Sequence, residues 1–345
     1  MNVKLVACIC LSSILLVAGC GKEEASNPEQ PPAASDSTDA GKTAEASQTY
    51  PLSGKVVQGD AEHRSVAVMI NNHPRARPQT GLQQADMVFE MLAEGNVTRF
   101  LAIYQSEFPE KVGPVRSARD YFIRIAKGMD SLYVCHGYSP EAKKLLDEHY
   151  VDSLNGLFYD GTLFKRDQSR KAPHNSYITF GNIEEGAKEK QVDMSQKPKA
   201  LSFLKDHEVS AIQGEAGKKA FISYGSSDFD VVYEYDEAEG RYTRSTGGTE
   251  MVDRGTEKPV MMDNIIILSA PHAVLDDKGR RDIDFSKGGE AYLLQKGKWN
   301  RIQWQYVNQA FVFQKNGAPV SFVPGKTWVN VVPGRNGLDS TVQLD

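Results

Sequence analysis

Apolar residues form one short run at the start of the chain, then stop, and return later as many strand-length runs. The opening run follows Lys4 and extends from Leu5 to Cys20. The next thirty or so positions, residues 21–50, contain no Leu, Ile, Val, Phe or Trp. A segment of this composition buries too little apolar surface to offset the entropy cost of ordering it. We therefore predict that the folded part begins near residue 51.

The first half of the folded part alternates between the strand and the helix pattern. Ser65–Asn71 is a continuous apolar run, typical of a buried strand. Gly95 and Asn96 separate two further strand-like runs and form a two-residue hairpin signal. Arg116–Met129 then has helical spacing, and Ser139, followed by proline and glutamate, is a good start for a second helix. This order predicts a mixed α/β arrangement.

The hairpin turn also assigns side chains to faces. With Glu94 opposite Val97, strict alternation places Glu90, Glu94 and Arg99 together on one side. The other side is then apolar apart from one hydroxyl and should face the core, with Met87, Phe89, Met91, Ala93, Phe100, Ala102 and Tyr104.

The second half changes to short alternating strands after Lys219, with a second hairpin signal at Asn316 and Gly317. The charged stretch between the halves is poor in aromatic residues and predicts a domain boundary. We predict an α+β fold whose C-terminal part is mostly antiparallel β. The predicted segments are a leader at 1–19, a lipidated cysteine and tether at 20–50, an N-terminal α/β domain at 51–205 and a C-terminal β-rich domain at 206–345.

The opening run is typical of a lipoprotein signal peptide. It has a basic start, an apolar segment too short to span a bilayer comfortably, and small residues directly before Cys20. In this interpretation the leader is removed, and lipid chains on Cys20 hold the protein on the outer face of a bacterial cytoplasmic membrane. A single uncleaved membrane helix is the less favoured alternative, because no basic stop signal follows.

Composition excludes several classes of function. Lys and Arg number 40 and Asp and Glu number 45, so the formal net charge of −5 gives no bulk basicity for binding nucleic acid. Beyond Cys20 the sequence has one cysteine, Cys135, which excludes an internal disulfide or a cysteine-rich zinc site. His136 follows it, but neighbours on a strand point to opposite faces, so we expect a buried, inert thiol rather than a catalytic pair. We expect no metal and no cofactor.

Three loop-like stretches gather the basic residues. The first, 71–81, leaves the end of the first predicted strand, where α/β folds place ligands. The second, 113–120, carries Arg116 and Arg119 at a predicted helix start, where the helix dipole disfavours cations. The third is 165–175. The candidate ligand-binding residues are Asn72, Arg75, Arg77, Arg116, Arg119, Arg166, His174 and Asn175.

Two interpretations of these arginines stay open. In the first, Arg116 and Arg119 pair with Glu90, Glu94 or Asp120 and only pin the helix to the sheet. In the second, the arginines and exposed backbone N–H groups form a pocket for a phosphate or a carboxylate.

Sequence signatures of catalysis are mostly absent. Asp167 and His174 could act as an acid–base pair near the arginines, which would make the protein a hydrolase or transferase of the cell wall.

Tryptophans in a small β domain are more often core residues than platforms for sugar rings, and we expect this of Trp299, Trp304 and Trp328.

The sequence resembles the YerB-like family of bacterial lipoproteins, a two-part domain of unknown function. The resemblance implies an envelope lipoprotein with two domains, and it implies no catalytic residues. The matching runs are Met69–Asn72, Ala76–Leu82, Glu94-Gly95, Thr98–Phe100, Gly113–Arg119, Arg166-Asp167, Ala172–Asn175 and Pro324–Trp328.

The sequence therefore favours a lipid-anchored envelope protein that acts by binding rather than by catalysis. Its expected partners are the membrane, through Cys20, and an anionic wall polymer or a protein of wall synthesis, through an arginine-lined pocket. The wall-modifying enzyme that uses Asp167 and His174 is one alternative. A scaffold that recognises another protein through its β domain is the other.

Overall fold

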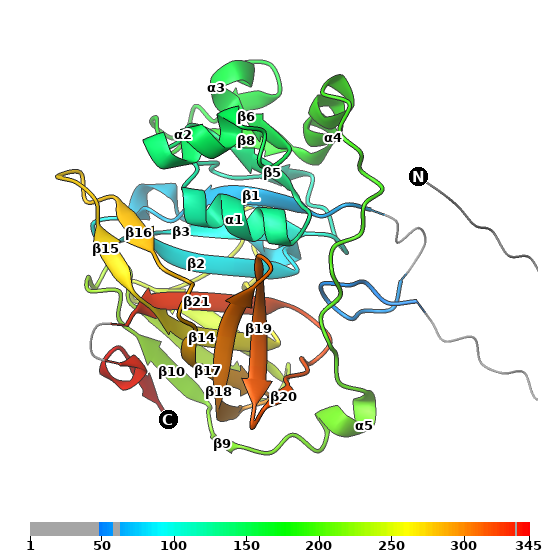
Figure 1. Cartoon of the computed structure of the whole chain (residues 1–345), viewed down its shortest axis with the longest axis vertical. Coiled ribbons are helices and arrows are strands. Elements are labelled where there is room, and N and C mark those ends of the chain that lie inside the picture. The colour runs from blue at the N-terminus through cyan, green and yellow to red at the C-terminus, as the bar shows by residue number, and fades with distance from the viewer. Residues whose placement is uncertain (1–47, 58–62, 335–336) are drawn as a thin grey trace, which may run out of the picture. The chain divides into compact units, whose positions relative to one another are not determined.

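A twelve-stranded sheet runs through the protein and takes strands from both halves of the chain (Figure 1). The computed structural model describes residues 48–57, 63–334 and 337–345, so the predicted leader, Cys20 and most of the tether lie outside the described residues. From one edge to the other the sheet consists of β20 (Ala318–Pro319), β19 (Ala310–Lys315), β18 (Lys298–Val307), β17 (Gly289–Gln295), β14 (Asn264–Ala270), β21 (Thr327–Pro333), β2 (Met87–Glu94), β3 (Val97–Tyr104), β1 (Val66–Asn71), β5 (Leu132–Cys135) and β6 (Ser153–Asn155), and β9 (Glu215–Ala216) pairs with β18.

Three smaller sheets, five α-helices and three short 3-10 helices (Pro74–Ala76, Leu82–Gln84 and Leu338–Ser340) complete the regular elements of the described structure. The smaller sheets are β13-β12-β11-β10-β22 (Thr249–Glu250, Arg241–Thr246, Val231–Asp236, Lys219–Ile222, Val342–Leu344), β15-β16 (His272–Val274, Arg281–Ile283) and β4-β8-β7 (Lys111–Val112, Ser176–Thr179, Phe164–Arg166). The helices are α1 (Asp120–Gly128), α2 (Pro140–Asp147), α3 (Gly156–Tyr159), α4 (Phe180–Glu189) and α5 (Asp206–Val209). Across the described ranges, none of these helices is long and apolar enough to cross a membrane.

Strand directions agree with the mixed pattern predicted from the sequence. In the first half, β1, β5 and β6 run parallel, while β1 and β2 pair with β3 antiparallel. In the second half most pairs are antiparallel, including the hairpin around Asn316 and Gly317, but β14 and β21 are parallel. The β21 strand is also parallel to β2, so a strand from near the end of the chain joins the two predicted parts within one sheet.

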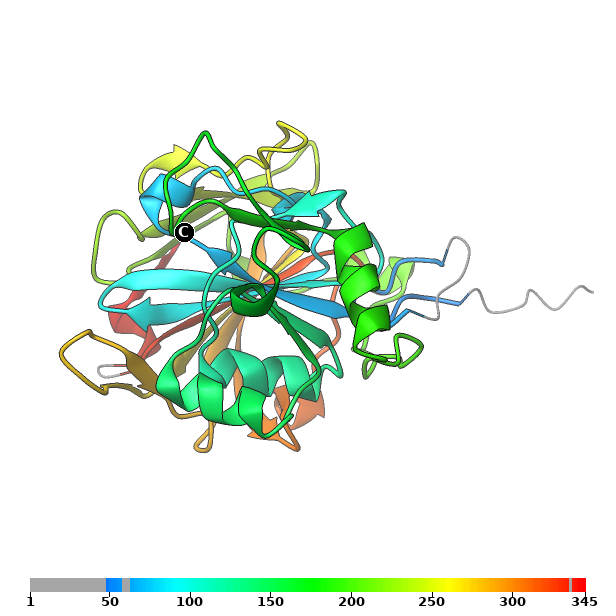
Figure 2. The ribbon, with the colours of Figure 1, turned by 90° about the horizontal axis from the view of Figure 1, so that it is seen from above.

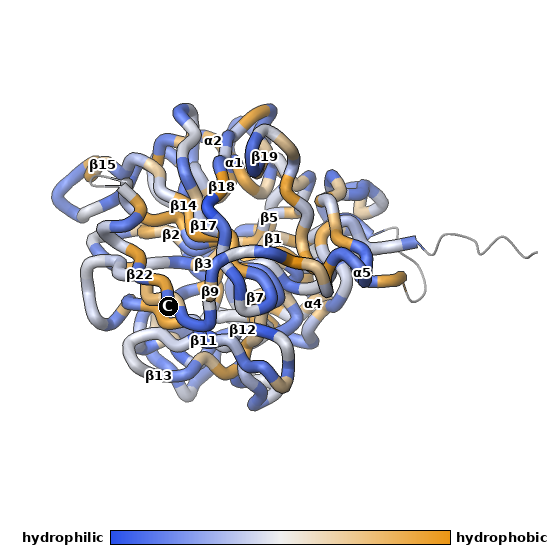
Figure 3. Tube along the Cα trace, turned by 90° about the horizontal axis from the view of Figure 1, so that it is seen from below, coloured by the Kyte–Doolittle hydropathy of each residue, from blue (hydrophilic) through white to orange (hydrophobic). Residues whose placement is uncertain are grey.

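Both faces of the large sheet are buried at its central strands, because strands such as β1 and β3 carry apolar side chains in both directions. One core includes Ile70 and Phe100 and lies against the five-stranded and three-stranded sheets. The other includes Met69, Leu101 and Phe122 and lies against α1 and α2, which Figure 2 shows together on one side of the sheet. Hydrophobic residues accordingly concentrate along the central strands, and hydrophilic residues occupy the surrounding loops (Figure 3).

The tryptophans belong to these cores, as predicted. Trp304 and Trp328 are 1% and 2% exposed, and Trp299 is partly buried against the first core. Trp304 and Trp328 are therefore not accessible for stacking on a sugar ring.

The first hairpin has the predicted turn but not the predicted register. Glu94 pairs with Val97 across the two-residue turn, yet Leu92 pairs with Thr98. Ala93 is therefore an extra residue, a β-bulge, and every pair beyond it is displaced by one position.

This displacement makes the predicted faces wrong, because a one-residue slip exchanges the two sides of a strand. Phe89 lies opposite Leu101, and Glu90 lies opposite Phe100. Glu90 and Arg99 consequently lie on opposite faces of the sheet and do not meet.

Glu90 instead lies in the core between the large sheet and the five-stranded sheet, where it forms an ion pair with Arg244. Both side chains are fully buried, and their nearest N and O atoms are 2.6 Å apart. Trp328 donates its indole N–H to the same carboxylate at 3.2 Å, and Thr98 donates its hydroxyl at 2.9 Å. The guanidinium of Arg244 also lies 4.7 Å from the Trp328 ring centroid. This buried group links the two halves of the chain.

The predicted helix begins later than its spacing indicates. Helix α1 starts at Asp120, with Arg119 at its N-cap, and Arg116 lies in extended chain before it. This extended segment bridges to β1 through Val115 and Ile70 and to the chain after β5 through Ala118 and Tyr138. Arg116 is therefore not in the first turn of a helix, and the argument from the helix dipole does not apply to it.

Candidate functional site

The candidate site lies at the carboxyl ends of the parallel strands β1 and β5. The extended chain before α1 passes between these ends, because the N–H of Arg116 donates to the carbonyl of Met69 at 2.9 Å and the carbonyl of Arg116 accepts from the N–H of His136 at 2.9 Å. Val115 donates to the carbonyl of Ser176 at 2.7 Å, which adds the chain from β8. Three segments distant in sequence thus meet where open α/β sheets place ligands.

Six basic side chains gather at this edge, and we call them the basic cluster. Asn71, at the end of β1, bonds His174 through its amide nitrogen and the ring Nδ1 at 2.9 Å. The ring of His174 stacks on that of His73, with centroids 4.4 Å apart. The basic cluster consists of His73, Arg75, Arg116, His136, Arg166 and His174.

Arg116 is the central charge of the cluster. Its guanidinium is partly buried and acts electrostatically on His73, His136 and His174. Burial, and then the neighbouring Arg99, lowers the pKa of Arg116 to about 10, so it remains charged at neutral pH. Within the described part of the chain no hydrogen bond or ion pair satisfies its side chain. The guanidinium of Arg116 therefore keeps its N–H donors available to solvent or to a bound anion.

The histidines of the cluster are held neutral. Burial, and then the positive charges of Arg75, Arg77 and Arg116, lowers the pKa of His73. Burial, followed by His73 and Arg116, lowers the pKa of His174 to about 4. Protonation of one of these histidines would therefore add to an existing excess of positive charge, which is unfavourable. A bound anion would make the protonated form of the histidine favourable.

Arg166 is partly neutralised at the edge of the cluster. It forms an ion pair with Asp160 at 2.8 Å and reaches the Nε2 of His136 at 3.0 Å. Asn175 accepts from Arg166 at 3.2 Å and donates to the carbonyls of Asp167 and Arg170, so it mainly orders its own loop.

The other predicted arginines lie elsewhere. Arg119 forms an ion pair with Glu94, which also binds Arg99 at 2.7 Å, so Arg119 pins the start of α1 to the sheet. Arg77 donates to the carbonyl of Asn72 at 2.9 Å and lies over the ring of Phe229.

Asn72 itself is fully buried. Its amide donates to the hydroxyl of Thr98 at 2.7 Å and to the carboxylate of Glu90 at 3.4 Å. Of the eight predicted binding residues, the structure gathers Arg75, Arg116, Arg166 and His174 in the cluster, with Asn175 supporting them.

Asp167 and His174 have different partners. Asp167 accepts from Arg254 at 2.6 Å and from the hydroxyl of Ser169, and these bonds hold the pKa of Asp167 well below its usual range. The ring of His174 bonds Asn71 instead. In the ranges that the structure describes, no hydrogen bond joins the two side chains of this predicted acid–base pair.

Sequence reasoning missed Asn71, His73 and His136 as site residues. The available signal was their position: Asn71 ends the predicted strand 65–71, His73 lies two residues beyond it, and His136 directly follows β5. His136 bonds the hydroxyl of Ser176 at 2.8 Å, away from its neighbour Cys135. Cys135 is buried in the core beside α1, and burial raises its pKa to about 12, which agrees with an inert thiol. No group of His, Cys, Asp and Glu in the described residues is arranged to hold a metal ion.

Comparisons with known proteins cover most of the folded part. Residues 52–193 match the family described as "Protein of unknown function (DUF3048) N-terminal domain", and residues 220–329 match its C-terminal domain. The chain is 46% identical to the "Putative lipoprotein YerB" of Bacillus subtilis (strain 168) over 286 residues, which are 82% of this chain and 86% of that protein. It is similar to the crystal structure of the YerB protein from Bacillus subtilis, with a TM-score of 0.79 and 45% identity over 86% of this chain and 99% of that one.

Proposed function

The chain belongs to the two-part DUF3048 family, and on this premise we propose that it is a lipid-anchored envelope protein that binds an anionic component through the basic cluster. The proposed anchor is Cys20, on the outer face of the cytoplasmic membrane. Its support is the leader pattern together with 46% identity to a protein whose name describes a lipoprotein. The proposed ligand is a phosphate of a wall polymer or a carboxylate of peptidoglycan, either alone or on a partner of wall synthesis.

One observation carries the proposal, namely the unpaired and partly buried guanidinium of Arg116. Described residues supply carboxylates to Arg99, Arg119, Arg166 and Arg244, but no carboxylate among them pairs with Arg116. A planar guanidinium presents paired N–H donors that match the oxygen atoms of a phosphate or carboxylate. Arg75, which is exposed and acts on the same His73 ring as Arg116, adds a second positive charge on the solvent side.

Replacing Arg116 with glutamine should weaken the binding of inorganic phosphate or sulfate about tenfold, because charge-assisted hydrogen bonds to the anion are lost. Isothermal titration calorimetry of the full-length chain at low salt measures this change, since low ionic strength leaves such contacts least screened. Arg301→Gln is the matched control. Arg301 is an exposed arginine already paired with Glu290 and Asp339, and its loss should leave anion binding unchanged.

The result would contradict the proposal if wild type binds neither anion, or if the Arg116 and Arg301 variants lose affinity equally. Thermal unfolding without ligand should show that Arg116→Gln is folded. Since the arginine has no partner to lose, the substitution should be neutral or slightly stabilising. The same pair of variants, compared for binding to lipoteichoic acid, then tests whether a polymer uses the same cluster.

Sulfate affinity should rise by at least about threefold as the pH falls from about 7 to about 5. In the free protein His174 has a pKa of about 4 and is neutral over this range. A bound anion favours the protonated ring and raises its pKa, so binding takes up a proton and strengthens as protons become available. Sulfate keeps its charge across this range, which makes it the suitable probe. Calorimetry at several pH values on wild type and His174→Gln checks this, and an equal pH dependence in both would refute it.

A further inference from the structure

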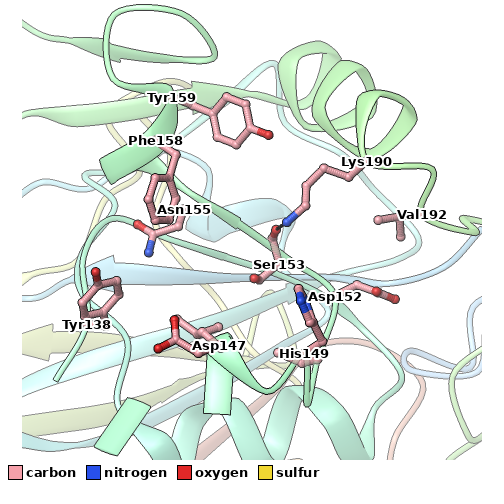
Figure 4. Close-up of a pocket in the computed structure, with 12 residues that line it drawn as sticks. Tyr138, Asp147, His149, Asp152, Ser153, Asn155, Phe158, Tyr159, Lys190 and Val192 are labelled. Atoms are coloured by element: carbon pink, nitrogen blue, oxygen red, sulfur yellow. Dashed lines mark hydrogen bonds between the residues drawn. The ribbon is translucent and has the colours of Figure 1, made fainter. Parts of the chain in front are cut away.

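A concave site distinct from the basic cluster lies beyond β6, the edge strand of the large sheet. It is a cavity of about 510 Å³, within the range of about 300–1,000 Å³ that holds small ligands in proteins. Figure 4 shows Phe158 and Asn155 on one side of the space and Asp147 and His149 on the other. Its walls come from β6, the end of α2, the short helix α3 and Lys190, just after α4.

The cavity is polar but has no unpaired carboxylate. Asp147 is paired with Lys143 at 2.5 Å, and Asp152 is paired with Arg64 at 2.7 Å. The ammonium of Lys190 donates to the carbonyl of Ser153 at 2.8 Å and points toward it in Figure 4. These walls therefore offer hydrogen-bond donors and acceptors, and their carboxylates do not need a positively charged ligand.

The edge of β6 offers the cavity a backbone donor. Tyr133 donates to the carbonyl of Asp152 at 2.9 Å, and in a parallel ladder this pattern turns both the N–H and the C=O of Ser153 away from β5. Because the ammonium of Lys190 already donates to that outward carbonyl, a peptide strand added to β6 would have to compete with it for the bond that the ladder needs. A ligand that bonds through separate hydroxyl groups does not need both the N–H and the C=O of Ser153.

Aromatic rings flank the same space. Phe158 is 76% exposed, the largest exposed fraction among the exposed large hydrophobic residues, although it lines the cavity. Tyr138 lies below it in Figure 4, and Tyr159 lies above. Rings with apolar faces and polar surroundings suit ligands that are apolar on one face and hydroxylated at the rim.

We propose that this cavity binds an uncharged sugar unit of an oligosaccharide, with Phe158 stacked on the sugar ring. Asn155, Lys190 and the N–H of Ser153 then serve the ring hydroxyls. The site is separate from the basic cluster but shares a wall with it, because Gly156, next to Asn155, lies against the ring of His136. The inference does not require an anion at Arg116.

Calorimetric titration of the full-length chain with neutral tetrasaccharides of N-acetylglucosamine and of glucose tests the proposal. At least one should bind saturably, and Phe158→Ala should weaken that binding about tenfold because the stacking face is lost. Leu157→Ala is the matched control, since Leu157 is a 51% exposed neighbour on the same helix and does not line the cavity. This control should bind like wild type.

Arg116→Gln separates this proposal from the proposed anion site. It should keep wild-type affinity for the neutral tetrasaccharide even where it loses sulfate. The cavity proposal is overturned if wild type binds neither tetrasaccharide, or if Phe158→Ala and Leu157→Ala bind equally well. Saturable, Phe158-dependent binding of a neutral pentapeptide in place of both sugars would also overturn it.

Discussion

Arg244→Met should lower the free energy of unfolding by about 3–5 kcal/mol, because it leaves the fully buried carboxylate of Glu90 without its counter-charge. The hydrogen bonds from Trp328 and Thr98 remain, but neither brings a positive charge. Methionine fills a similar volume, so the loss reports the charge rather than a large void. Equilibrium unfolding in urea measures the change.

Two companion variants identify the cause. Glu90→Gln combined with Arg244→Met removes both charges and keeps an acceptor for Trp328 and Thr98, so it should recover part of the stability lost in the single variant. Arg301→Met breaks an ion pair of 42% exposed Arg301 and should cost no more than about 1 kcal/mol. If Arg244→Met costs as little as this control, the buried pair does not stabilise the fold as we argue.

Gly128→Ala should destabilise the protein by about 3 kcal/mol, although alanine is the better helix former. Gly128 is the last residue of α1, and a Cβ built there would lie 1.7 Å from the carbonyl oxygen of Gln309. That oxygen belongs to the backbone of the turn between β18 and β19, so it cannot move aside as a flexible side chain would. Urea unfolding again provides the measurement.

Gly181→Ala is the matched control, because Gly181 lies within α4 with nothing inside 4 Å of the added methyl group. There the helix preference of alanine acts alone, and stability should rise by up to about 1 kcal/mol. Equal effects at Gly128 and Gly181 would show that α1 does not approach the turn so closely.

Local signals in the sequence were sufficient for many of the elements. Ser139 caps α2 as predicted, with its hydroxyl accepting from the N–H of Ala142 at 3.2 Å. The turns at Gly95 and Asn316 also form, because two-residue hairpin signals depend only on neighbouring residues. The bulge at Ala93 carries no comparable local signal, so the faces of β2 were assigned wrongly.

The sequence indicated where the candidate site would lie, but not which residues would make it up. The end of β1 was expected to present ligand-binding groups, and the basic cluster lies there. Which arginines stay unpaired could not be predicted, since this depends on acids from distant strands, as with Glu94 for Arg119 and Asp160 for Arg166. Arg116 differs because its extended segment passes between β1 and β5, and those acids pair with other arginines there.

The position of β21 between β14 and β2 has a consequence for the order of events during synthesis. Ribosomes release the N-terminal residues first, yet β2 gains its second neighbour only after Thr327–Pro333 has emerged. Until then a nascent chain presents the open side of β2, with its unpaired amides and carbonyls, to any other chain nearby. Completion of the sheet therefore waits for β21, and a product truncated before Thr327 should be prone to aggregation.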